Sequence, residues 1–165
     1  MIFFTIISTS SVLAEIQNKG VEERFVERFI EVTNVEEASN MVPFQVSTLI
    51  DLLPREFDGV NPYVYVSLTP IDKSPSAVTQ IWSTKGRGHF LALNQSPSLT
   101  GIVGSSIANI DGFDEQVQVH KVENENVPTI FIIHWKQNGI GYNLAGTLSM
   151  GLCEETIIKL AKTLK

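Results

Sequence analysis

The sequence predicts an α+β fold: a twisted antiparallel sheet of about five to seven strands, covered by a C-terminal helix, with one or two helices at the N-terminus. Three observations predict this class. Apolar residues recur with helical spacing only near the two ends of the chain. From Pro43 onward the apolar spacing changes to two, which is typical of strands. No segment of helical period interrupts the strands, so the sequence indicates no parallel βαβ unit.

Length and composition narrow the class further. The chain has 165 residues, of which 43% are hydrophobic and 18% charged, and this suits one domain or one domain with a short appendage. The formal net charge is −6, whereas a protein that binds nucleic acid needs a positively charged surface. One cysteine excludes an intramolecular disulfide and a cysteine-rich zinc site. The three histidines lie far apart in the sequence. We therefore expect no nucleic-acid partner, no metal and no cofactor.

The first segment, Met1–Ala14, is uncharged and resembles a secretory signal. It is apolar and ends in Val12-Leu13-Ala14, with small residues at the two positions that a signal peptidase inspects. As a helix it spans only about 21 Å, short of the roughly 30 Å of a bilayer core. No basic residue precedes the apolar stretch, so a truncated membrane anchor and a buried N-terminal strand stay open as alternatives. We expect an exported or membrane-anchored chain on the extracytoplasmic face.

Residues 15–34 are expected to form an amphipathic helix or a linker before the domain. Within Gly20–Thr33, Phe25, Phe29 and Val32 are spaced i, i+4, i+7, and charged residues occupy the other side. The mixed charges argue against a basic membrane-surface helix. Such a helix packs on the domain, dimerises, or separates the domain from a membrane.

The single α+β domain is expected to span residues 35–165 and to open with a short helix. Asn34 is a good N-cap, and Glu37 follows three residues later, as in a capping box. Pro43 is expected to stop this helix.

The strands follow from residue alternation and turn chemistry. In the hairpin formed by Ala77–Thr84 and His89–Gln95, Gly86 allows a type II′ turn that places Trp82 opposite Leu91. Between the hairpins, residues 96–113 indicate a loop with at most one short strand. Strands are expected over Tyr63–Leu68, Ala77–Thr84, His89–Gln95, Gln116–Val122, Val127–Lys136 and Ile140–Leu148.

The last hairpin carries the clearest local signal. Asn138-Gly139 is the preferred pair for a type I′ turn, and it pairs Trp135 with Tyr142 and Ile133 with Leu144 on one face. Ile130 and Ile132 then point to the other face, so we expect this hairpin to be central and covered on both sides.

The chain is expected to end in a helix over Leu152–Leu164 that lies across the sheet. Acidic residues in its first turn and lysines at its end suit the helix dipole. Its apolar stripe comprises Cys153, Ile157, Leu160, Ala161 and Leu164. On this stripe the Cys153 thiol is expected to be buried and unreactive.

Candidate chemical groups are few. His134 lies within the central hairpin and is interpreted as structural, whereas His89 and His120 are expected to be solvated. Asp111–Glu115 concentrates three carboxylates, but the spacing of a calcium loop is absent. The glycines of 86–88 and 139–141 are interpreted as turn residues, because neither group opens a helix.

The final hairpin and helix resemble an uncharacterised bacterial extracytoplasmic domain family. That family occurs in membrane-anchored proteins, some of them anti-sigma-factor-like or sporulation-associated. The ending also resembles, more distantly, the C-terminal domain of the RseB/MucB regulators of envelope stress and the lipoprotein-carrier superfamily. The resemblance rests on Ile133–Trp135, the Asn-Gly turn, Gly141–Leu148, Glu154–Leu164 and, upstream, Glu36–Ala38, Val42–Val46 and Leu53-Pro54.

The resemblance implies packing residues and no catalytic ones. It implies that Gly146 lets a strand approach its neighbour. The expected structural core is Trp135, Tyr142, Ile133, Leu144, Gly146, Leu160 and Leu164.

The expected function is non-enzymatic binding of a protein partner or envelope ligand, in envelope or sporulation signalling. A carrier of a lipid or other apolar ligand, held between sheet and helix, is the first alternative. A hydrolase that uses His134 or the acidic loop is the second. The oligomeric state stays open.

Overall fold

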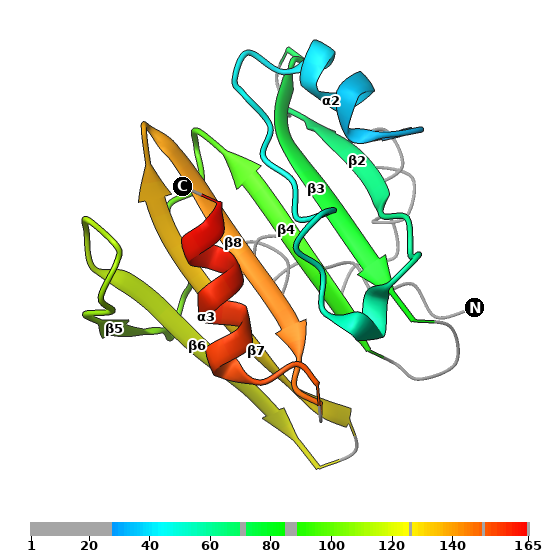
Figure 1. Cartoon of the computed structure of the whole chain (residues 1–165). Helices are drawn as coiled ribbons and strands as arrows, with labels where there is room; N and C mark the ends of the chain where they lie inside the picture. Colours follow the sequence, from blue (N-terminus) through cyan, green and yellow to red (C-terminus); the bar gives the residue numbers. More distant parts are fainter. Residues whose placement is uncertain (1–27, 70–71, 85–88, 126, 150, 165) are drawn as a thin grey trace, which may run out of the picture.

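The computed structural model describes residues 28–69, 72–84, 89–125, 127–149 and 151–164 (Figure 1). Their strands form one antiparallel sheet of eight strands in the order β1-β2-β3-β4-β8-β7-β6-β5. The α+β class, the antiparallel sheet and the C-terminal helix are confirmed, and the strand count exceeds the predicted five to seven. The strands are β1 (Phe29–Val32), β2 (Tyr63–Leu68), β3 (Pro75–Ser83), β4 (Phe90–Ser96), β5 (Ser106–Ala108), β6 (Val117–Asn124), β7 (Val127–Gln137) and β8 (Ile140–Thr147).

Strand β1 corrects the helix predicted over Gly20–Thr33, at least for the part that is described. Phe29–Val32 pairs antiparallel with β2, with Val32 opposite Val64. The segment fits both periods, because Ile30 and Val32 also lie two residues apart. Pairing with β2 places Val32 in a cluster with Ala38 and Val64, where it is 7% exposed, and this burial favours the strand. Residues 20–27 lie outside the described residues, as do Met1–Ala14.

Helix α2 (Val35–Met41) begins and ends as the sequence predicts. The Asn34 side chain accepts a hydrogen bond from the Glu37 backbone N–H at 2.9 Å. In a capping box the glutamate side chain accepts a hydrogen bond from the backbone N–H of the N-cap residue. Here the Glu37 carboxylate accepts instead from the N–H and the hydroxyl of Thr33, one residue before the N-cap. These bonds lower the pKa of Glu37. The helix ends two residues before Pro43.

Both predicted hairpin registers are confirmed. Trp82 lies opposite Leu91 in the β3–β4 pair. In the β7–β8 pair Trp135 lies opposite Tyr142, and Ile133 lies opposite Leu144. At its turn Asn138 and Gly139 both have positive φ, +50° and +78°, as a type I′ turn requires. The turn at 85–88 lies outside the described residues.

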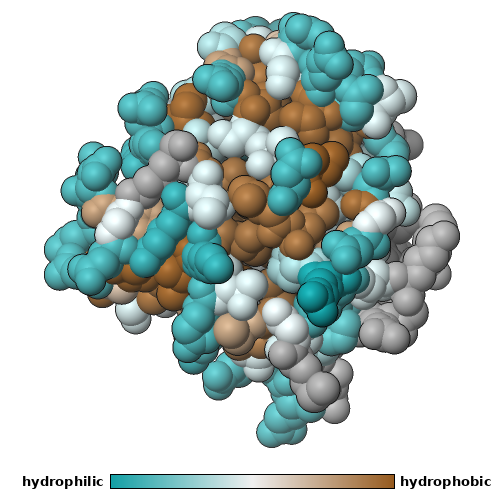
Figure 2. Space-filling model, in the orientation of Figure 1, coloured by the Kyte–Doolittle hydropathy of each residue, from teal (hydrophilic) through white to brown (hydrophobic). Residues whose placement is uncertain are grey.

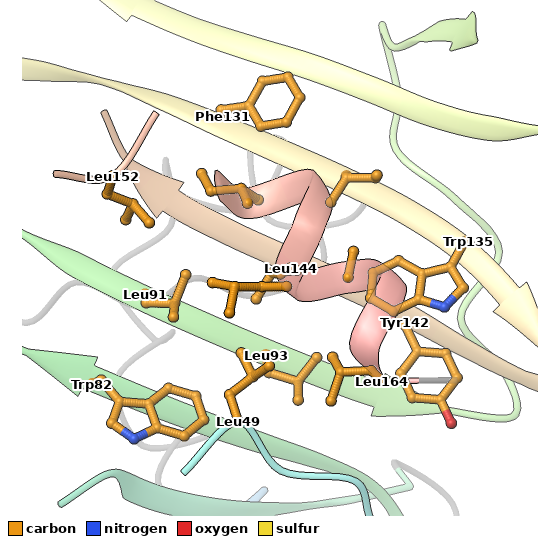
Figure 3. Close-up of a cluster of buried hydrophobic side chains, with 14 of the residues drawn as sticks. Leu49, Trp82, Leu91, Leu93, Phe131, Trp135, Tyr142, Leu144, Leu152 and Leu164 are labelled. Atoms are coloured by element: carbon orange, nitrogen blue, oxygen red, sulfur yellow. The ribbon is translucent and has the colours of Figure 1, made fainter. Parts of the chain in front are cut away.

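One face of the sheet carries a second layer made of α2, a segment that crosses the sheet, a short 3-10 helix η1 (Arg55–Phe57) and helix α3 (Glu154–Thr163) (Figure 1). We call residues 43–54 the crossing segment. Helix α3 packs on β7 and β8, whereas α2 packs on β1, β2 and β3. Figure 3 shows large side chains from the sheet, α3 and the crossing segment meeting in the main core.

Two glycines of β8 set how closely its neighbours approach. A Cβ atom on Gly146 would lie 2.8 Å from Leu152 and 3.1 Å from Ile157, so this glycine admits α3 and the residues just before it. A Cβ atom on Gly141 would lie 2.7 Å from Leu99 on the other face. Gly141 is therefore a packing position inside a strand, and the interpretation of it as a turn glycine is wrong.

The other face of the central hairpin is covered by the loop of residues 97–105. Ile102 of this loop packs on Ile132 of β7 and Ala145 of β8, and all three are buried. The expectation that the hairpin is central and covered on both sides is confirmed.

Candidate functional site

A row of polar side chains crosses the face of the sheet that lies opposite α3. Cross-strand partners in this row are Thr79, Asn94, Asn143, His134 and Gln118, on β3, β4, β8, β7 and β6. The Nδ1 atom of His134 lies 2.7 Å from the Oδ1 atom of Asn143. An amide oxygen only accepts, so Nδ1 carries the proton. His134 is 5% exposed, and burial lowers its pKa although the bond to Asn143 acts in the opposite direction.

Gln118 attaches this half-buried row to the loop 97–105. Gln118 accepts a hydrogen bond from the Ile102 N–H at 2.9 Å and another from the Ser105 hydroxyl at 3.1 Å. The Oδ1 atom of Asn94 is buried and has no hydrogen-bond partner among the described residues. The row contains one titratable group and no acidic partner, so its geometry indicates packing and loop attachment.

The acidic loop Asp111–Glu115 lies on the opposite side of the sheet from His134. Phe113 packs edge-on against Trp135, with ring centroids 5.8 Å apart, and Gly112 lies beside Lys162 of α3. His134 points to the face away from α3. The two groups that the hydrolase alternative names therefore lie on opposite faces of the sheet and do not combine into one site. No group of three or more potential metal ligands occurs among the described residues.

The lone cysteine is exposed, and its predicted burial is wrong. Helix α3 starts at Glu154, so Cys153 is the N-cap with extended backbone and its side chain leaves the apolar stripe. The Sγ atom lies 3.2 Å from the Thr156 hydroxyl. The expectation for the other histidines holds only in part. His89 is half-buried, and His120 has its Nδ1 atom 3.1 Å from the Gly104 carbonyl oxygen.

The residues expected to form the structural core are all buried. Trp135 and Tyr142 stack with ring centroids 5.0 Å apart and an interplanar angle of 8°. Their exposures are only 2% and 6%, so neither lines an open crevice. Ile133, Leu144, Gly146, Leu160 and Leu164 are buried with them.

The space between the sheet and α3 is occupied by side chains (Figure 3). The largest of these side chains expose less than 2% of their surface and belong to one cluster. A carrier of an apolar ligand needs a cavity at this place. The packing therefore favours a solid core here. These residues are Trp82, Phe57, Leu49, Leu91, Leu93, Ile133, Leu144, Leu152 and Ile157.

A pair of buried glutamines, which the sequence reasoning missed, attaches the crossing segment to the sheet. Gln95 accepts from the Ser47 N–H at 2.8 Å and donates to the Ser47 carbonyl oxygen at 2.8 Å. Gln80 donates to the same carbonyl oxygen at 2.7 Å. We call these three residues the glutamine clasp. The predicted register contained the signal, because it places both glutamines on the same face as Trp82 and Leu91.

The crossing segment also exposes apolar side chains. Ile50 and Leu52 are 46% and 41% exposed, whereas Leu49 of the same segment is fully buried. Figure 2 shows hydrophobic atoms gathered across the middle of this face, with hydrophilic atoms around them. We call Ile50, Leu52 and the half-buried Leu53 the crossing-segment patch. Exposed apolar groups with a polar rim are typical of interaction sites.

No family model matches the chain, and no curated protein or solved structure matches it either. Within the described residues, no helix combines the length and apolar character that crossing a bilayer requires.

Proposed function

We propose that this chain is a non-enzymatic, extracytoplasmic binding domain that engages a protein partner. The observation that carries the proposal is the crossing-segment patch. Ile50 and Leu52 remain exposed beside a core in which the neighbouring large side chains are buried. The partner is a protein that presents aliphatic or aromatic side chains to this patch.

The crossing-segment patch is anchored on both its polar and its apolar side. The glutamine clasp fixes the crossing segment at Ser47, three residues before Ile50. Leu49 anchors it in the main core. Because the crossing segment is anchored at both Ser47 and Leu49, the patch is ordered before it binds, and this lowers the entropic cost of association. Asp51, which is exposed between the two apolar residues, favours a partner with basic residues at the rim.

The extracytoplasmic location rests on the sequence. The apolar, uncharged Met1–Ala14 segment resembles an export signal, and the final hairpin and helix resemble an extracytoplasmic bacterial family. A role in envelope or sporulation signalling is the most specific reading that this resemblance supports.

A photo-cross-linking amino acid at position 50 tests the binding surface. We expect one discrete adduct, identified by mass spectrometry, and no such adduct from the same probe at Val103, which is 68% exposed but lies in the loop over the opposite face. With the identified partner purified, Leu52→Asp should weaken binding at least tenfold, and Val103→Asp should leave it unchanged. Equal effects of the two aspartates would contradict the proposal.

Fractionation of bacteria that express the tagged full chain tests the location. We expect the chain in the membrane or extracytoplasmic fraction. Recovery from the cytosol alone would remove this part of the proposal.

A further inference from the structure

Strand β6 has an outer edge that β5 covers only in part. β5 pairs with Val117–Val119, whereas β6 continues to Asn124 and pairs with β7 on its inner side. Figure 1 shows the far half of β6 at the border of the sheet. Over His120–Glu123 this border has no strand neighbour among the described residues. Unpaired strand edges are templates for pairing with another chain.

Exposed apolar side chains accompany this edge. Val122 of β6 is 39% exposed and points away from α3. Ile107 of β5 is 68% exposed and lies on the same face, since its cross-strand partner is Gln118. Lys121 points to the α3 face, where its Nζ atom lies 2.6 Å from the Glu154 carboxylate. Glu123 follows at the same parity and shares that face.

We infer that β6 pairs with β6 of a second copy of this chain in an antiparallel, two-fold arrangement centred on Val122. The proposal concerns another surface than the crossing-segment patch and does not depend on it. Two-fold pairing makes the contact isologous, so that the same stretch of β6, Lys121–Glu123, supplies both sides. It joins the sheets of the two copies into one.

The charges on the edge select this register. Pairing centred on Val122 sets Lys121 of each copy opposite Glu123 of the other, so both cross-strand pairs have opposite charge. Antiparallel pairing centred on Lys121 sets the two lysines opposite each other, and pairing centred on Glu123 does the same for the glutamates. In-register parallel pairing juxtaposes like charges at both positions.

Edge length also fits. A lysine on an edge strand usually discourages pairing, but here the symmetric register gives each lysine a carboxylate. The cross-strand pairs over Lys121–Glu123 lie on the part of β6 beyond its pairing with β5. Pairing beyond Val119 is blocked by β5, so the register has little room to slide.

The test uses charge exchange in the full 165-residue chain, with mass measured by light scattering and sedimentation across a concentration series. We expect a species of twice the 18.3 kDa chain mass. Glu123→Lys sets a lysine opposite Lys121 in both of the symmetry-related cross-strand pairs. It should raise the dimer dissociation constant at least tenfold. Adding Lys121→Glu exchanges both signs and should return the constant to within about threefold. Because Lys121→Glu would place a carboxylate beside Glu154, all charge variants carry Glu154→Gln, which removes this exposed ion pair at little cost.

Disulfide trapping gives a second readout that does not depend on charge. In a Cys153→Ser background, Val122→Cys places two thiols at the symmetry axis, where directly opposed Cα atoms are about 4.5–5.5 Å apart, within disulfide range. Mild oxidation should yield a covalent dimer. Ile107→Cys is the matched control. Position 107 is more exposed than position 122, but in the proposed dimer residue 107 of one copy lies roughly 25 Å from residue 107 of the other along the paired strands.

Three results would each overturn the inference. One is a monomer at every concentration together with no Val122→Cys dimer. The second is a dimer that is unaffected by Glu123→Lys, which would place the contact elsewhere. The third is equal cross-linking through positions 107 and 122.

Discussion

The two halves of the sheet face beneath the helices are packed with side chains of different size. Under α3 and the crossing segment, the core contains four buried aromatic residues of the sheet, and leucines and isoleucines pack against them. The four aromatic residues are Trp82, Phe131, Trp135 and Tyr142. Under α2, the cluster consists of five valines and one alanine, with no buried aromatic residue. The α3 helix has 10 residues and the α2 helix has 7.

This difference indicates which half of the sheet contributes more to the free energy of unfolding. Hydrophobic stabilisation scales with buried apolar area, so the α3 half contributes more per residue. The α2 half depends more on polar contacts, namely the Asn34 cap and the glutamine clasp at its border. We expect the α2 half to open first in local unfolding, because units with few buried apolar contacts open at low free energy. The predictions below test this ranking.

Removal of Trp135 should give the largest loss. Its ring stacks on Tyr142 and meets Phe113 edge-on, and it is 2% exposed. Trp135→Ala should lower the free energy of unfolding by about 3–5 kcal/mol, the range for large aromatic deletions in cores. Urea unfolding followed by circular dichroism measures it. A loss below about 1 kcal/mol would show that the α3 half is not the stronger one.

The glutamine clasp offers a matched pair. Gln95→Leu leaves both the N–H and the carbonyl of Ser47 without their Gln95 partner, and should cost about 2–4 kcal/mol. Gln80→Leu removes one bond to the same carbonyl and also removes the buried Oε1 atom, which has no hydrogen-bond partner within the described part of the chain. It should cost about 1 kcal/mol or less, by the same reasoning. Equal losses in denaturant unfolding would contradict the geometry of the clasp.

A cavity in the α2 half should cost less than one in the α3 half. Val66 is fully buried in the α2 cluster. Val66→Ala removes two carbon atoms and should lower the free energy of unfolding by about 2 kcal/mol. Native-state hydrogen exchange should show faster opening of β2 amides with those of β7 unchanged. If β7 amides accelerate equally, the two halves open as one unit.

The helix cap should have a smaller and local effect. Asn34→Ala removes the acceptor of the Glu37 N–H and should cost about 1 kcal/mol. Asn40→Ala, at an exposed position of the same helix, is the control and should change stability by less than about 0.5 kcal/mol. A cap variant indistinguishable from this control in thermal unfolding would show that α2 does not limit stability.

His134 should make stability depend on pH. Burial lowers its pKa in the folded chain, whereas the unfolded chain has the ordinary value of about 6.5. As pH falls through this value the unfolded state takes up the proton first, so folding stability is highest above it and declines below it. His134→Gln, which keeps a donor toward Asn143, should flatten this part of the pH profile measured by urea unfolding. An unchanged profile would indicate that His134 is not the group responsible.

Much of the fold was predictable because its causes are local. Alternation fixed the faces of the strands, and Asn138-Gly139 fixed the last register, since a two-residue turn leaves one pairing that keeps Trp135 beside Tyr142. The Asn34 cap was predictable from two residues. The predictions failed where two local patterns competed. Phe29–Val32 fits a helix or a strand, and Cys153 lies one residue outside the helix it was placed on.

The candidate binding surface was less predictable. Residues 43–54 have no regular period, so the sequence gives no faces from which to divide buried Leu49 from exposed Ile50. The predicted register places Gln80 and Gln95 on the inward face, but their common acceptor, the Ser47 carbonyl oxygen, is distant in the chain and could not be predicted.

By itself the sequence determined the fold class, most strands, both hairpin registers and the part of the main core that the last hairpin and the C-terminal helix supply. These depend on side-chain period and turn geometry, which act over a few residues. Only the tertiary structure decided that β1 joins the sheet edge, that the crossing segment is held at Ser47, and that β6 keeps part of its edge uncovered. Each of these depends on which distant segments meet, because burial and hydrogen bonding between them outweigh weak local preferences.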